Sequence, residues 1–132
     1  MVYQLFLVED HPVMREAYAH VLSSAPDLHL YGQAETAEQA LDVLDGASCD
    51  LVVTDVRLPG MSGIDLTSRI QERWPALPVV IITGHEDSLF ERRAEEAGAV
   101  AFLPKRLAPT RLLDTIRGAL GASSPGAPAL SA

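Results

Sequence analysis

The chain has 132 residues, one cysteine, and 18 acidic against 10 basic residues, which give a formal net charge of −8 at pH 7. Such acidity argues against a protein that binds nucleic acid irrespective of sequence, since that binding needs clustered Lys and Arg. One cysteine excludes a disulfide framework and a cysteine-based zinc site. The apolar runs are too short to span a membrane and the start shows no secretory signal, so we expect one soluble domain in the cytoplasm.

Short apolar runs alternate with helical patterns along the chain. Four runs, bounded by polar or turn residues, predict strands buried on both faces of a parallel sheet: residues 5–8, 51–53, 79–82 and 100–103. The segment 28–33 is more mixed and contains Gly32, which favours an edge strand.

Helix signals lie between these runs. Pro12 suits the first position of a helix, and Thr36 with Gln39 resembles a capping box. Ser62 can cap a third helix that ends near Arg73. The first helix should bury an apolar stripe made of Val13, Met14, Ala17, Tyr18, Val21 and Leu22.

Two further helices complete the pattern. Ser88 with Glu91 opens a fourth, thinly apolar helix, which Gly98 can end in a left-handed conformation. Pro109 starts a fifth. Five strands alternating with five helices predict an α/β fold, (βα)5, with right-handed crossovers. Residues 121–132 contain only Gly, Ala, Ser, Pro and Leu, which predicts a flexible linker or tail after one domain of residues 1–120.

Polar residues follow four of the expected strands. They are Glu9 with Asp10, then Asp55, Thr83 and Lys105. With the strand order 2-1-3-4-5 these side chains would converge at the carboxyl ends of the strands. Three close carboxylates repel, and a Mg²⁺ ion with oxygen ligands and the lysine ammonium would offset that repulsion. A carboxylate, a Mg²⁺ site, a hydroxyl and a lysine are the parts needed for phosphoryl transfer to an aspartate.

Each of these residues alone has an ordinary explanation. Asp55 can be a turn residue, Glu9 and Asp10 can favour the start of the first helix, and a lone lysine is commonly solvated. Their joint position at the strand ends is the informative signal.

Four segments resemble the response-regulator receiver domain of two-component signalling, in order and in spacing. They are residues 8–15 (VEDHPVMR), 52–66 (VVTDVRLPGMSGIDL), 79–84 (VVIITG) and 98–105 (GAVAFLPK). The resemblance covers roughly residues 3–120. It implies a flavodoxin-like three-layer sandwich around a five-stranded parallel sheet of order 2-1-3-4-5.

The resemblance also implies a role for each strand-end residue. Asp55 would be the phosphoacceptor. Asp10 would bind Mg²⁺ directly and Glu9 would bind it through water, while the backbone carbonyl of Arg57 would complete the protein ligands. Thr83 would hydrogen-bond the phosphoryl group. Lys105 would pair with the phosphoryl group, and Phe102 would be the switch residue. The loop beside the site would be shaped by Pro59, Gly60 and Gly63.

The same resemblance implies the partners. A sensor histidine kinase would donate the phosphoryl group, and a conformational switch would control an output. The HPVMR start at residues 11–15 resembles receivers that precede helix-turn-helix domains, so we expect a covalently linked DNA-binding domain and regulation of transcription. A homodimer through the helical faces fits the family. The domain itself would touch neither nucleic acid nor membrane, and it would phosphorylate and dephosphorylate itself rather than turn over a substrate.

Two features depart from the family pattern. Phe102 offers no hydroxyl at the switch position. Arg106 follows Lys105 where the family often has a proline after a cis peptide bond, and a cis bond without that proline costs about 3–4 kcal/mol. The isomer of this bond therefore stays open. Arg57 and His85 would flank the acceptor and tune the lifetime of the phosphoryl group.

Rival functions need residues that the chain lacks. A haloacid-dehalogenase-type phosphatase would need a second acid at the position of Arg57. A flavin-binding protein would need backbone amide donors where Glu9 to Pro12 offer carboxylates. A degenerate receiver would have lost Asp10, Asp55 or Lys105. A stand-alone receiver that acts as a protein-interaction module is the alternative for the output.

Overall fold

The computed structural model describes residues 2–46, 48–84, 88–105 and 108–123. Within them, five strands alternate with five helices. The strands are β1 (Tyr3–Val8), β2 (Leu28–Ala34), β3 (Leu51–Asp55), β4 (Val79–Thr83) and β5 (Ala101–Pro104). The helices are α1 (Pro12–Ser23), α2 (Ala37–Leu44), α3 (Gly63–Arg73), α4 (Ser88–Ala97) and α5 (Ala108–Ser123).

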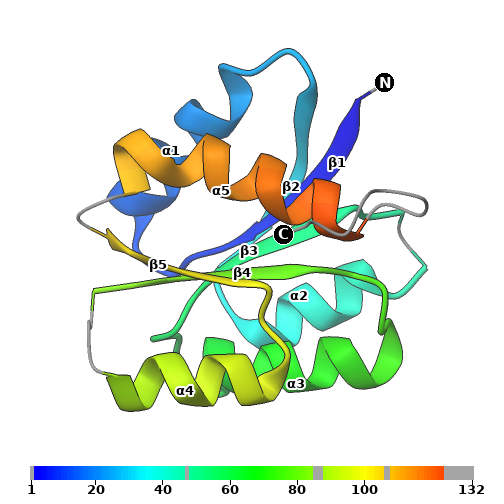
Figure 1. Cartoon of the computed structure of the whole chain (residues 1–132), viewed down its shortest axis with the longest axis vertical. Helices are drawn as coiled ribbons and strands as arrows, with labels where there is room; N and C mark the ends of the chain where they lie inside the picture. The colour runs from blue at the N-terminus through cyan, green and yellow to red at the C-terminus, as the bar shows by residue number, and fades with distance from the viewer. Residues whose placement is uncertain (1, 47, 85–87, 106–107, 124–132) are drawn as a thin grey trace.

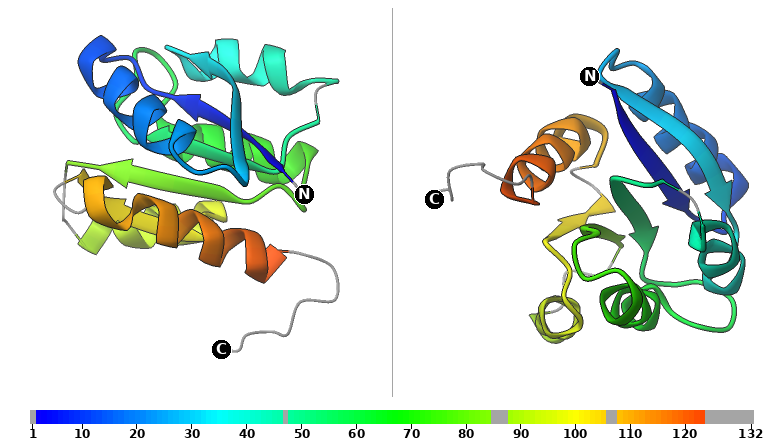
Figure 2. Two further views of the ribbon diagram at one scale, coloured as in Figure 1. Left: turned by 90° about the horizontal axis from the view of Figure 1, so that it is seen from above. Right: turned by 90° about the vertical axis from the view of Figure 1, so that its right-hand side faces the viewer.

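The strands form one parallel sheet in the order β2-β1-β3-β4-β5. Helices α1 and α5 cover one face, and α2, α3 and α4 cover the other (Figure 1). Figure 2 shows the sheet between these two helical layers. The three-layer sandwich and the strand order expected from the sequence are therefore confirmed. No helix in the described part of the chain is long and apolar enough to cross a membrane.

The central strands are apolar and β2, at one edge of the sheet, is mixed, as expected. Strand β5, at the other edge, is only partly buried, although its apolar run predicted burial on both faces. Strands β3 and β4 are buried along their whole length. In β2, Gly32 pairs with Phe6 just after a register shift between Leu5 and Phe6. A Cβ atom on Gly32 would lie 2.8 Å from Cε1 of Phe6, so the missing side chain leaves room for the aromatic ring.

Side-chain caps fix where α2 and α3 begin. The Thr36 hydroxyl accepts a hydrogen bond from the Gln39 N–H (3.1 Å), and the Ser62 hydroxyl accepts one from the Asp65 N–H (3.1 Å). The Gln39 side chain, however, reaches the N–H of Glu35 rather than that of the cap residue. Gly98 has a φ of 105° and ends α4, as its position predicted.

The first helix buries a narrower stripe than its sequence predicted. Tyr18 and Leu22 are buried, whereas Val13 is 68% exposed and Ala17 is also exposed. Within the described residues, α1 packs on the sheet and against α5 (Figure 1), and these contacts leave the Val13 side of the stripe uncovered. At the other end of the chain, α5 continues to Ser123, so the first three residues of the expected tail are helical. Residues 124–132 lie outside the described part.

Candidate functional site

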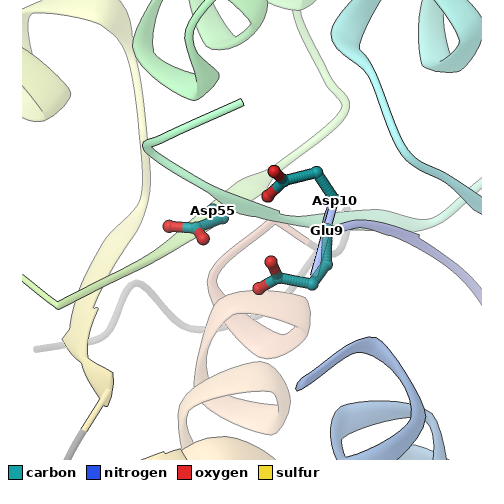
Figure 3. Close-up of side chains that lie close together, drawn as sticks. All are labelled: Glu9, Asp10 and Asp55. Atoms are coloured by element: carbon teal, nitrogen blue, oxygen red, sulfur yellow. The ribbon is translucent and has the colours of Figure 1, made fainter. Parts of the chain in front are cut away.

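Three carboxylates meet where strands β1 and β3 end. Glu9 and Asp10 follow β1, and Asp55 is the last residue of β3. Because these strands are parallel neighbours, their carboxyl ends lie side by side. One oxygen from each of the three side chains lies within 4.8 Å of the others. Figure 3 shows the three carboxylates directed toward the same side of the sheet edge.

Lys105 is the cation of this cluster. It follows β5, two strands away from β3, and its Nζ lies 3.0 Å from Oδ2 of Asp55 and 3.9 Å from Oε1 of Glu9. The first distance is that of a charge-assisted hydrogen bond, and the second is too long for one. One ammonium thus faces three carboxylates, and the cluster keeps an excess of negative charge.

Glu9 carries the largest electrostatic cost in the cluster. Its side chain is 1% exposed, and this burial raises its pKa to about 7. The N–H of His11, which donates to Oε2 at 3.1 Å, lowers the pKa in part, and the charge of Asp55 raises it again. The other oxygen, Oε1, is buried and has no hydrogen-bond partner within the described residues.

This donor set fits a hard divalent cation. All its groups are carboxylate oxygens, which Mg²⁺ prefers, and one of them lacks a donor. Asp10 is exposed, so a cation bound there can keep several of its waters. The residues present therefore fit Mg²⁺.

A close backbone contact holds the end of β3 against α3. A Cβ atom on Gly63 would lie only 1.9 Å from the backbone oxygen of Asp55, and the N–H of Gly63 donates to the carbonyl of Val56 (2.8 Å). Only glycine permits this approach. The N–H of exposed Arg57 faces Oδ1 of Asp55 at 3.4 Å, so the loop after β3 lies against the carboxylate.

The remaining predicted site residues occupy neighbouring strand ends. Thr83 ends β4, where it is 1% exposed and pairs with Pro104 of β5. Phe102 lies in β5, half-buried against the core beneath α2, α3 and α4. His85 and the peptide bond between Lys105 and Arg106 lie outside the described residues.

Sequence reasoning assigned no role to Arg15, which supports the site from α1. Its Nη1 donates to the backbone oxygen of Glu9 at 3.0 Å and lies 3.5 Å from Oε1 of Glu35. Arg15 therefore ties the start of α1 to the ends of β1 and β2. The sequence could have indicated this role, because α1 begins directly after the acidic pair and Arg15 lies one helical turn after its N-cap, His11.

Comparison with known proteins decides what this arrangement is. Residues 5–117 match the family described as the response regulator receiver domain. The chain belongs to this family. Receiver domains bind Mg²⁺ at an acidic pocket, and this chain has a cluster of acidic groups, Glu9, Asp10 and Asp55, at the ends of its strands.

Curated relatives of this receiver include transcriptional regulators and protein-glutamate methylesterases. The chain is 35% identical to the transcriptional activator protein ExaE of Pseudomonas putida, over 88% of this chain and 54% of the relative. It is also 35% identical to the transcriptional regulatory protein FixJ of Bradyrhizobium diazoefficiens, over 93% and 59%. The chain therefore spans about half the length of the curated relatives it matches.

A solved structure of a related protein has the same fold. The crystal structure of a LuxR-family two-component response regulator from an Aurantimonas species superposes with a TM-score of 0.89. The two sequences are 31% identical, and the alignment covers 97% of this chain and 91% of the other.

Proposed function

We propose that Asp55 accepts a phosphoryl group from the phosphohistidine of a sensor histidine kinase in the cytoplasm, and that the phosphorylated receiver controls transcription through a linked DNA-binding domain. The observation that carries this proposal is the convergence of Glu9, Asp10 and Asp55 with the Lys105 ammonium, 3.0 Å from Asp55. Two relatives, which are transcriptional regulators about twice as long, support the output.

The acidic pair and the acceptor would hold the cation. Asp10 and Asp55 offer direct carboxylate ligands, Glu9 would bind through water, and Arg57 would add its backbone carbonyl. When bound, Mg²⁺ offsets the repulsion between the acceptor carboxylate and the phosphoryl oxygens.

The chain's own side chains would then perform the transfer. A carboxylate oxygen of Asp55 attacks phosphorus while the P–N bond of the phosphohistidine breaks, and the imidazole of the kinase retains the electron pair. Lys105 pairs with the phosphoryl oxygens and the Thr83 hydroxyl donates a hydrogen bond to one of them. Movement of Thr83 and Lys105 would repack Phe102 on the adjoining strand, which is how the switch would reach the α4–β5 surface.

This surface would also serve a homodimer. Leu89 of α4 and Val100 before β5 are each about half exposed, which leaves apolar area for a second copy.

The test is labelling by a small phosphodonor. Wild type, Asp55→Asn and Asp50→Asn are incubated with acetyl phosphate and Mg²⁺, and intact mass is measured. Asp50 lies at the opposite end of β3, so its variant is a matched control. We expect one added phosphoryl group on the wild type and the control, none on Asp55→Asn, and none after chelation of Mg²⁺. Undiminished labelling of Asp55→Asn would refute the assignment.

A further inference from the structure

The hydroxyl of Tyr18 is buried without a partner. Tyr18 lies on α1 with its ring in the core between the sheet and helices α1 and α5, and the side chain is 4% exposed. Its hydroxyl has no hydrogen-bond partner within the described residues. A buried polar atom without a partner is costly and rare, so it calls for a functional explanation or an ordered water.

Helix geometry directs the Tyr18 hydroxyl toward the site. The N-cap of α1 is His11, directly after the acidic pair, so the amino end of the helix is at the site. Side chains on a helix lean toward its amino end, which directs the long Tyr18 side chain toward the site from within the core. After burial, the charges of Glu9 and Asp55 are the causes that raise the pKa of Tyr18. The hydroxyl is therefore within electrostatic reach of both carboxylates and keeps its proton.

Glu9 offers the missing acceptor. Its Oε1 is also buried without a hydrogen-bond partner, since the nearest cation, Lys105 Nζ, is 3.9 Å away. Within the described residues, a buried donor without an acceptor and a buried acceptor without a donor thus belong to adjoining segments, α1 and the residue that follows β1. Pairs of this kind are joined directly or through one buried water.

We propose that Tyr18 is a positioning residue, whose hydroxyl donates to Glu9 Oε1 directly or through one buried water and so fixes the carboxylate for Mg²⁺ binding. The proposal rests on the proposed function, because it assigns a second layer to that same cation site. Partners of this kind behind a ligand hold its orientation and strengthen metal binding.

Tyr31 provides a matched control within the same chain. Its hydroxyl is also buried, but Tyr31 comes from β2, its hydroxyl lies beside the Cys49 thiol, and its ring contacts the opposite core, beneath α2, α3 and α4. The neighbours that raise its pKa, after burial, are Cys49 and Asp50, at the far end of the sheet from the acidic cluster. Replacing either tyrosine by phenylalanine removes one hydroxyl and nothing else.

The first measurement is Mg²⁺ affinity by calorimetry for wild type, Tyr18→Phe and Tyr31→Phe. We expect about tenfold weaker binding for Tyr18→Phe and wild-type affinity for Tyr31→Phe. Labelling by acetyl phosphate should slow in Tyr18→Phe at low Mg²⁺ and recover at saturating Mg²⁺, because the acceptor itself is unchanged. A merely structural role would not produce this dependence on Mg²⁺. Equal Mg²⁺ affinity in wild type and Tyr18→Phe would overturn the proposal.

A second measurement uses the wild type and holds even if Tyr18→Phe folds poorly. With tyrosine labelled at ¹³Cζ, the Tyr18 resonance should shift on addition of Mg²⁺ while that of Tyr31 stays in place. If the Tyr18 resonance does not shift with Mg²⁺ while wild type binds Mg²⁺ and is labelled at Asp55, this inference is refuted and the proposed function is not. A wild type that does neither would overturn the proposed function and this inference with it.

Discussion

Acidic residues are paired differently at the two ends of the parallel strands, which we call the amino edge and the carboxyl edge of the sheet. At the amino edge, where the strands begin, each acid has its own donor: Asp50 Oδ2 accepts the N–H of Gln4 at 2.7 Å, and Asp27 binds Arg117 through two hydrogen bonds of 2.9 and 3.2 Å. At the carboxyl edge, three carboxylates lie close together, and the ammonium of Lys105 pairs with two of them, Asp55 and Glu9.

Strand β3 carries both cases within one short run. Asp50 directly precedes β3 and accepts a hydrogen bond from Gln4. Asp55 is the last residue of β3 and adds to the repulsion among the clustered carboxylates. The acids at the amino edge therefore stabilise the fold. Those at the carboxyl edge repel one another, and the rest of the structure compensates for that cost. Local strain at a functional site is tolerated when the surrounding core is well packed, and here the two apolar layers supply that packing.

The largest effect should come from the contact that holds the carboxyl edge together. In Gly63→Ala the new methyl group would meet the backbone oxygen of Asp55, which cannot move aside without displacing the end of β3. We expect a loss of about 3 kcal/mol or more in the free energy of unfolding, measured by urea denaturation.

Gly118→Ala is the control for this substitution. Gly118 lies within α5, and a Cβ atom there would meet nothing within 4 Å. Alanine should therefore stabilise the helix by about 1 kcal/mol. If Gly63→Ala were as stable as wild type, the close packing of α3 on β3 would be wrong.

The pH dependence of stability should reveal the buried carboxylate. Glu9 has a pKa of about 7 in the folded chain, against 4.5 ordinarily. Between these values the folded state binds more protons than the unfolded state, so the free energy of unfolding falls as pH rises. Without Mg²⁺, wild type should lose at most about 3 kcal/mol over this range relative to Glu9→Gln.

Two comparisons sharpen this result. Adding Mg²⁺ should reduce the loss, because the cation favours ionised Glu9. Glu72→Gln, a change at an exposed glutamate on α3, should keep the wild-type dependence. A Glu9→Gln variant with the same pH dependence as wild type would show that Glu9 is not the responsible group.

Neutralising an exposed acid should change the stability of the protein in opposite directions at the two edges. Asp10→Asn removes one charge from a cluster whose oxygens lie within 4.8 Å, so the Mg²⁺-free protein should gain about 1 kcal/mol while Mg²⁺ ceases to stabilise it. Asp50→Asn weakens the hydrogen bond from Gln4 and should destabilise the protein slightly. Thermal denaturation with and without Mg²⁺ measures both. Destabilisation by Asp10→Asn without Mg²⁺ would contradict the repulsion.

The sequence predicts this contrast only in part. Asp55 directly follows a buried apolar run, so its place at the carboxyl edge follows from the strand pattern, and the same holds for Lys105. The exposure of Val13 does not, because a helical stripe fixes a direction but not how far neighbouring elements cover it. The contact of Gly63 with Asp55 and the unpaired hydroxyl of Tyr18 depend on distances between elements, which no local pattern encodes.

The smallest effect should come from the exposed pair at the amino edge. The hydrogen bonds from Arg117 lower the pKa of Asp27, so this pair stabilises the protein above the ordinary Asp pKa of 3.8 and loses that contribution as pH falls. Arg117→Gln should lower the melting temperature slightly at neutral pH and low salt. The difference should vanish in about 1 M salt, where charges are screened within about 3 Å. Arg69→Gln, at an exposed position on α3, is the control and should show less of this salt dependence. A salt-independent loss in Arg117→Gln would mean that the packing of its aliphatic stem matters more than its charge.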